Sequence, residues 1–197
     1  MADHFPQIAG HPALDLLNTI HWRLAPERRT DDLASYPDVL FWAEKTGFVT
    51  AAEVRQLAGL AQATPDAAMT AVSSLRELRE SAYGALIDHD AEATATLARL
   101  YRHAHQQAEL RATGNRWAWQ DRELALTTPR DRVARSMLAL MQSEQVTLLH
   151  RCEDDACGWV YLDTSPRRNR RWCIASDCGD RNRAREYYRR QRRMSSA

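Results

Sequence analysis

Four cysteines near the C-terminus have the type and spacing of a metal site. Cys152 and Cys157 form one C-x4-C pair, and Cys173 and Cys178 form a second pair after fifteen intervening residues. Tetrahedral zinc is commonly bound by four ligands that arrive as two close pairs. The alternatives are two disulfides or four unliganded thiols, and the two matched pairs favour zinc over both. Because four thiolates fill the coordination shell, the pattern predicts one structural Zn2+ without an open catalytic position.

Two groups of arginines accompany the second cysteine pair. The first group lies within about 80° on one face of the helix predicted after Cys178, and consists of Arg181, Arg185, Arg189 and Arg192. The second group lies in the turn between the cysteine pairs, and consists of Arg167, Arg168, Arg170 and Arg171. Guanidinium groups bind phosphate through two hydrogen bonds and release counterions from nucleic acid. The pattern predicts nucleic-acid binding. The alternatives are that the arginines pair with acidic residues of the chain or are merely solvated.

The charge distribution indicates that the two parts of the chain have different roles. Residues 1–150 carry 15 basic and 19 acidic side chains, whereas residues 151–197 carry 12 arginines and 7 acids. The N-terminus has no signal-peptide pattern, and no apolar run approaches the roughly 18 residues of a membrane span. We therefore expect a cytoplasmic protein that does not bind membranes. No Ser/His/Asp or Cys/His arrangement, HExxH motif or glycine-rich phosphate loop is present, so no catalytic residues are predicted.

Helix-start signals dominate residues 1–149. Ser35 with Asp38 and Thr50 with Glu53 are typical of helix N-termini, and Pro65 and Pro129 open two further helices. Another helix is expected over about residues 91–112, and a short helical turn before Cys152. Alternating apolar residues predict a small hairpin around Trp117 and Trp119, continuing to Leu124 and Leu126. The predicted fold is mainly α, with a helical domain over residues 1–149 and a zinc module over residues 150–197.

The zinc module is expected to be treble-clef-like, with a knuckle, a β-hairpin and a helix. Residues 158–163 read as one strand and residues 170–174 as the returning strand. On the following helix, one face is formed by Ala184, Tyr187, Tyr188 and Gln191. We expect this face to pack on the hairpin, where Trp159, Tyr161 and Trp172 offer aromatic surface. The arginine face of the helix would then point outward.

Polar residues in the first apolar segment form a second candidate site. Asp15, Asn18 and His21 lie near one face of "ALDLLNTIHW", as expected of a pocket for a small-molecule effector. The alternative is the solvated side of an N-terminal helix. Four tryptophans are expected to pack in the core or between the domains, namely Trp22, Trp42, Trp117 and Trp119.

The last part of the chain, "RCEDDACGWVYLDTSPRRNRRWCIASDCGDRNRAREYYRR", resembles the CGNR-type zinc finger. The upstream "HPALDLLNTI" and "DDLASYPDVLFWAEKTGFV" resemble the ABATE domain that precedes this finger. The resemblance implies a bacterial stress-related transcription regulator whose finger binds DNA. Asp180 stands where that finger motif has Asn. We interpret Asp180 as a residue that caps the start of the helix, rather than one that meets phosphate.

The leading hypothesis is therefore a DNA-binding regulator with a structural zinc, whose helical domain senses an effector or forms a homodimer. One alternative is an RNA-binding protein, which would use the same phosphate contacts. The other is a protein-interaction module in which zinc is purely architectural.

Overall fold

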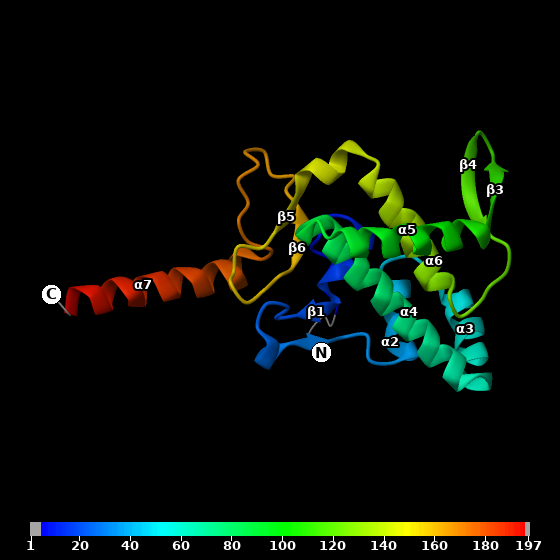
Figure 1. Ribbon diagram of the computed structural model, residues 1–197, viewed down its shortest axis with the longest axis horizontal. Coiled ribbons are helices and arrows are strands. Elements are labelled where there is room, and N and C mark those ends of the chain that lie inside the picture. The colour runs from blue at the N-terminus through cyan, green and yellow to red at the C-terminus, as the bar shows by residue number, and fades with distance from the viewer. Residues whose placement is uncertain (1–4, 196–197) are drawn as a thin grey trace.

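The computed structural model describes residues 5–195 and confirms a mainly helical fold with small antiparallel strand pairs (Figure 1). The helices have these bounds: α1 Pro12–Asp15, α2 Tyr36–Lys45, α3 Ala51–Ala63, α4 Pro65–Tyr83, α5 Ala91–Gln106, α6 Thr128–Met141 and α7 Asp180–Ser195. The strands are β1 Ile20–His21, β2 Thr30–Asp31, β3 Ala108–Thr113, β4 Arg116–Asp121, β5 Leu149–Arg151 and β6 Val160–Leu162. None of the helices within residues 5–195 is long and apolar enough to cross a membrane.

Local helix signals position most of the helical domain. Ser35 and Thr50 each form the expected capping box, with Asp38 and Glu53, at the starts of α2 and α3. Pro65 and Pro129 lie in the first turns of α4 and α6. The apolar faces of these helices meet in one large core that contains Trp42, as expected. The predicted short turn is also present, as the 3-10 helix Glu144–Leu148.

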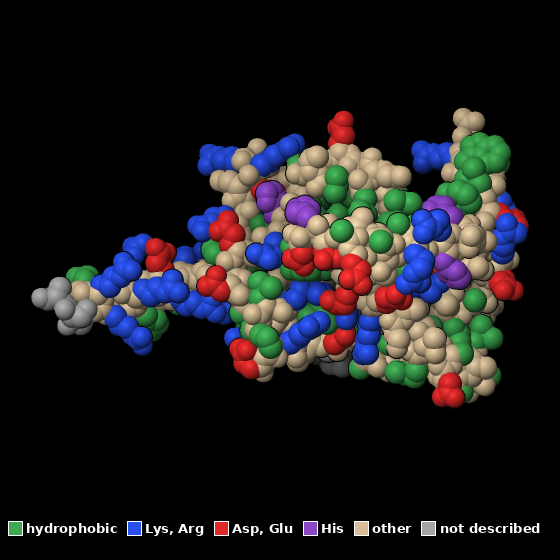
Figure 2. Space-filling model, viewed as in Figure 1, with side chains coloured by type: hydrophobic (Ala, Val, Ile, Leu, Met, Phe, Trp, Pro, Cys, Tyr) green, Lys and Arg blue, Asp and Glu red, His purple; other side chains and the backbone are tan. Residues whose placement is uncertain are grey.

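The hairpin β3–β4 corrects three expectations. Leu124 and Leu126, expected to continue the hairpin, lie after β4 and outside any strand, because β4 pairs with residues upstream of it. The helix expected to reach residue 112 ends at Gln106, because residues 108–113 pair with residues 116–121 as strands. Trp117 and Trp119 are in β4 as predicted, but they are 71% and 46% exposed and so do not belong to the core. The hairpin stands away from the helices (Figure 1), and Figure 2 shows hydrophobic side chains exposed along it, below its tip.

The N-terminal segment is buried where it meets the zinc module. It forms α1, the 3-10 helix Leu17–Thr19 and the short strands β1 and β2. Leu14, Leu16, Leu17 and Ile20 are almost completely buried. The short elements change direction often, so backbone groups from several of them face the C-terminal part of the chain.

The strand pairing in the zinc module differs from the expected hairpin. Residues 160–162 form a strand as predicted, but β6 pairs with β5, which precedes Cys152, and residues 170–174 are not a strand. The first cysteine pair thus lies in the loop between the two paired strands. The side chains of β6 alternate: Val160 and Leu162 join the core of the helical domain, whereas Tyr161 joins the cluster around the cysteines. One strand is shared by two cores.

The C-terminal helix α7 has the opposite roll from the one predicted. Tyr187 and Tyr188 are 59% and 65% exposed and contact each other edge to face, instead of packing on Trp159, Tyr161 or Trp172. A π-helical turn, Ala175–Gly179, leads directly into α7. Beyond this root, α7 projects away from the body as a single rod (Figure 1).

Candidate metal centre and basic helix

The four cysteine thiols form one compact cluster. All four side chains are buried, and their Sγ atoms lie within 4.8 Å of one another. The Sγ atoms of Cys157 and Cys173 are 3.6 Å apart, and those of Cys173 and Cys178 are 3.4 Å apart. A disulfide would require about 2.05 Å, whereas tetrahedral zinc with 2.3 Å Zn–S bonds sets the sulfurs about 3.8 Å apart. The cysteines therefore fit one structural zinc ion.

Two hydrogen-bond donors contact the cysteine sulfur atoms, as expected around a zinc site. The backbone N–H of Cys173 donates to Cys152 Sγ at 3.4 Å, and Arg181 Nη2 donates to Cys178 Sγ at 2.9 Å. Four thiolates around one Zn2+ carry a net charge of −2. A guanidinium beside one sulfur offsets part of this charge, and such outer contacts tune the strength of metal binding.

Arg181 is held by the helical domain as well as by the metal centre. Its guanidinium lies 4.4 Å from the ring of Trp22, and its side chain forms an ion pair with Asp177. Trp22 has a backbone φ of 52° and also stacks on Arg28, 3.4 Å from its ring. Trp22 therefore packs between the domains, as expected. Arg181 lies in the structure of the metal centre and does not extend from α7 into solvent.

Asp154 fixes how α7 rolls. This buried carboxylate, inside the first cysteine pair, accepts hydrogen bonds from Asn182 Nδ2 at 2.7 Å and from the backbone N–H of Ala156 at 3.0 Å. Arg181 and Arg185 approach the same Oδ2 atom at 3.5 Å. The arginine face therefore turns inward at the root of the helix. Sequence reasoning missed Asp154 and Asn182; an acid between two ligating cysteines was the available signal.

The turn arginines also divide by their contacts. Arg170 donates to the carbonyls of Trp172 and Cys173, at 3.0 and 2.5 Å, and its guanidinium lies 4.0 Å from the ring of Tyr161. Arg171 forms an exposed ion pair with Glu153. Arg167 and Arg168 are exposed, as are Arg189 and Arg192 on the outer part of α7.

Asp180 is not a helix cap. Its backbone is helical, with φ −66° and ψ −42°, because the π-helical turn continues directly into α7. Its exposed carboxylate pairs with Arg183 one turn further along the helix. The acid lies near the positive end of the helix, where its charge is favourable. Its carboxylate bonds to Arg183 and not to a backbone N–H at the helix start.

Asp15, Asn18 and His21 serve contacts within the protein. Asp15 Oδ1 accepts the backbone N–H groups of Ile8 and Ala9 at 3.1 and 3.0 Å, and burial raises the pKa of Asp15 to about 6. His21 Nε2 lies 2.6 Å from Asp32 Oδ2, and its ring packs on Trp159. Asp15 and Asn18 are buried, so the alternative of a solvated helix side is wrong for them.

Asn18 is the centre of the contact between the two parts of the chain. Its Nδ2 donates to the carbonyl of Val160 at 2.9 Å, and its Oδ1 accepts the Val160 N–H at 2.8 Å. Leu162 N–H donates to the Ala9 carbonyl at 2.8 Å, so the N-terminal segment bonds to β6 at two positions. Asn18, one of the three residues expected to bind an effector, thus holds the strand that carries the zinc module.

Strand β1 and the loop after it contact the knuckle, which is the loop that carries Cys152 and Cys157. Arg23 N–H donates to the Cys157 carbonyl at 2.9 Å, and Trp159 Nε1 donates to the Ile20 carbonyl at 2.8 Å. Gly158 has a φ of +75°, and a Cβ there would lie 2.8 Å from the Arg23 Cβ. Glycine after the second cysteine therefore permits the close approach of the two backbones.

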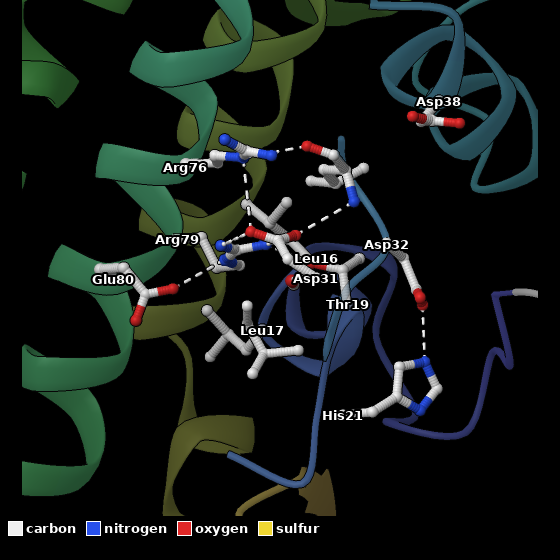
Figure 3. A network of polar contacts seen from close by, with 12 residues as sticks. Leu16, Leu17, Thr19, His21, Asp31, Asp32, Asp38, Arg76, Arg79 and Glu80 are labelled. Atoms are coloured by element: carbon white, nitrogen blue, oxygen red, sulfur yellow. Dashed lines mark hydrogen bonds and ion pairs between the residues drawn. The ribbon is translucent and has the colours of Figure 1, made fainter. Parts of the chain in front are cut away.

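An ion-pair network around the buried Arg79 side chain also supports the loop after β1 (Figure 3). Both guanidinium nitrogens Nη1 and Nη2 of Arg79, on α4, donate to the carboxylate of Asp31 at 2.7 Å. Arg23 joins the same network through Glu80, at 2.5 Å. The network ties the β1–β2 segment to the longest helix, and so positions the residues that hold the zinc knuckle.

An apolar cleft lies away from this junction. It has a volume of about 520 Å3 and is formed by α2, α3 and α4, with Tyr36, Phe41 and Met69 in its wall.

Fold and site together define a two-part protein: a helical domain joined through a shared strand to a four-cysteine zinc module. Residues 149–191 match the CGNR zinc finger family. Residues 10–144 match the ABATE family, described as "Putative stress-induced transcription regulator", and the chain belongs to this family. Both resemblances expected from the sequence are confirmed, in the expected order. No curated protein matches the chain.

Proposed function

We propose that the protein is a transcription regulator that binds DNA through exposed arginines of its zinc module. The observation that carries the proposal is α7, a zinc-anchored helix with seven arginines and two acids, whose outer turns extend into solvent. In Figure 2 basic side chains cover α7, whereas acidic ones gather over the helical domain. Such a helix favours a polyanion by counterion release and guanidinium–phosphate contacts.

The hydrogen bonds and exposure of the predicted arginines indicate which of them would contact phosphate. Arg170, Arg181 and Arg185 bond within the zinc module. We assign the phosphate contacts to the exposed arginines of the outer helix and the turn, which are Arg167, Arg168, Arg189 and Arg192. Arg171 is exposed beside them, in its ion pair with Glu153. The proposal places the protein in the cytoplasm, where bacterial DNA lies.

For the helical domain we propose effector sensing or homodimer formation. The apolar cleft between α2, α3 and α4 supports the first role, because its volume and apolar wall suit a small hydrophobic molecule. The two matching families, a regulator family and a zinc-finger family, support a role without catalysis.

The test is binding of the zinc-loaded protein to labelled duplex DNA over a range of salt concentrations. The Arg189→Ala/Arg192→Ala variant should bind more weakly, and its plot of log affinity against log salt should be shallower by about 2 for two lost phosphate contacts. The matched control is Arg55→Ala/Arg102→Ala, which removes two exposed arginines of the helical domain. No duplex binding at low salt, or equal losses in both variants, would refute the proposal.

RNA is the principal competing partner. Structured RNA offers the same phosphate charge, so competition between duplex DNA and RNA separates the two. A protein complex through α7 that persists at high salt would instead favour an interaction module.

A further inference from the structure

The outer part of α7 is open on every side. The helix has 16 residues and is therefore about 24 Å long. Its contacts with the knuckle are at the root, where Asp154 meets Asn182 and Arg185. Further out Tyr187, Tyr188 and Met194 are all exposed, and Figure 1 shows no other element beside the rod.

The side chains of α7 are arranged as one face between two basic flanks. At 100° per residue, Tyr187, Gln191 and Ala184 share a face, with Tyr188 at its edge. Arg183 and Arg190 lie about 100° to one side of this face, and Arg192 lies about 100° to the other side. Arg189 lies about 150° from the centre of this face, on the side of the helix that also carries Arg185. At the root of the helix Asp154 draws the opposite side toward the knuckle, so this face points away from the knuckle.

We propose that α7 is a recognition helix that enters the major groove of duplex DNA, an inference that rests on the proposed function. In the groove, the two basic flanks would meet the two phosphate backbones, and the face of Tyr187 and Gln191 would meet base edges. A major groove about 12 Å wide admits a helix, and a glutamine amide matches the edge of adenine. The major groove of A-form RNA is too narrow for side chains to read, so the partner is B-form DNA.

The acids on the helix fit this placement. Asp180 and Glu186 pair with Arg183 and Arg190 along one flank. The ion pairs hold these side chains against the helix, and phosphate can replace the carboxylates as the partner. Asp180, near the root, would then affect affinity through Arg183 rather than by touching a base.

The experiment measures how strongly the full-length, zinc-loaded protein binds duplex DNA in which the major or the minor groove is blocked. The probe is a duplex enriched from random sequence by the protein itself, prepared with and without glucosylated hydroxymethylcytosine, which fills the major groove. We expect glucosylation to weaken binding about tenfold or more, and netropsin in the minor groove to leave it unchanged. Displacement by netropsin with no effect of glucosylation would overturn the groove assignment while leaving DNA binding intact. Equal affinity for double-stranded RNA of the same sequence would overturn it as well.

Matched variants test the roles of the face and the flanks. Gln191→Ala should reduce the preference for the enriched duplex over a random duplex about fivefold or more, with an unchanged salt slope. Arg190→Gln/Arg192→Gln should instead lower the salt slope by about 2 and keep the preference. Zinc content and helicity serve as folding controls for these exposed positions. A Gln191→Ala variant that loses affinity equally for both duplexes would refute the assignment. Absence of any duplex binding by the wild type would refute the proposed function itself.

Discussion

Arginines of the zinc module divide into two classes by what their side chains contact. Arg181 bonds to Cys178 Sγ and lies on Trp22, and Arg170 bonds to the carbonyl of Cys173. Arg189 and Arg192 are exposed on the outer helix. The same residue type therefore supports the metal centre at one position and is exposed on the outer helix at another. Substitutions in the two classes should have different consequences.

Arg181→Gln should weaken zinc binding. The substitution removes a positive charge 2.9 Å from a thiolate, and loss of such an outer contact costs about tenfold or more in metal affinity. Competition with a chromophoric chelator measures the effect. Arg192→Gln, which removes the same charge from the far end of α7, is the matched control and should retain zinc like the wild type. Equal retention in both variants would contradict a role for Arg181 at the metal centre.

Asp15→Asn should change how stability depends on pH. Burial raises the pKa of Asp15 from 3.8 to about 6 in the folded protein, so the folded state binds more protons between these values. The contribution of Asp15 to stability is fully present below pH 4 and is lost as pH rises through 6. With 1.36 kcal/mol per pKa unit, the loss amounts to about 3 kcal/mol at most.

Asparagine keeps an oxygen that can accept the N–H groups of Ile8 and Ala9 but cannot ionise. Urea unfolding of Asp15→Asn from pH 4 to pH 7 should therefore show a smaller fall in unfolding free energy than the wild type. Asp88→Asn, in which an exposed acid is neutralised, should follow the wild type. Parallel curves for Asp15→Asn and the wild type would rule out this effect of burial.

At the scale of elements, α7 has an anchored root and an unsupported outer half. Asp154 and the metal centre hold its first turns. Further along, Arg185, Arg189 and Arg193 are spaced four residues apart, and like charges at this spacing destabilise a helix by about 0.2–0.5 kcal/mol per pair. Glu186 with Arg190 is a favourable pair at the same spacing. The outer turns should therefore gain stability from bound anions.

Circular dichroism should report this gain. Adding sulfate should increase the helical signal of the full-length protein, because anions reduce the repulsion among the arginines. A variant that ends at Glu186 lacks the outer turns and should show little change. An equal response in both proteins would assign the effect to another part of the molecule.

At the scale of the whole molecule, zinc and the helical domain share one structural unit. Val160 and Leu162 of β6 pack in the main core, and the Asn18 side chain bonds to both backbone groups of Val160. Zinc binding should therefore stabilise the helical domain as well as the last residues of the chain.

Removing zinc with a chelator should lower the melting temperature of the entire protein in a single transition. Asn18→Ala should destabilise the zinc-loaded protein by about 2–4 kcal/mol, because it leaves two buried backbone groups without partners. Asn115→Ala, in the exposed hairpin turn, is the control. Two separate transitions, with the helical transition independent of zinc, would refute the coupling.

Sequence reasoning was most successful where the determining interactions are local. The capping residues Ser35 and Thr50, the strand that holds Trp117 and the cysteine spacing all depend on neighbours a few residues away. The pairing of β6 with β5 was not predicted, because several segments have similar strand propensity and tertiary contacts select the partner. The exposure of Trp117 and Trp119 was not predicted, because an alternating pattern shows a strand but not whether another element covers it.

The sequence by itself determined the metal centre, the mainly helical fold and the family, because each follows from residue types at short, characteristic spacings. Only the tertiary structure decided the roll of α7 and the role of Asn18. Asp154 reaches Asn182 and Arg185 across 28 and 31 residues, and Asn18 reaches Val160 across 142. Contacts over such separations depend on how the whole chain packs. For this reason the face expected to be buried on α7 is exposed, and Asn18, a residue expected to bind an effector, joins the two parts of the protein.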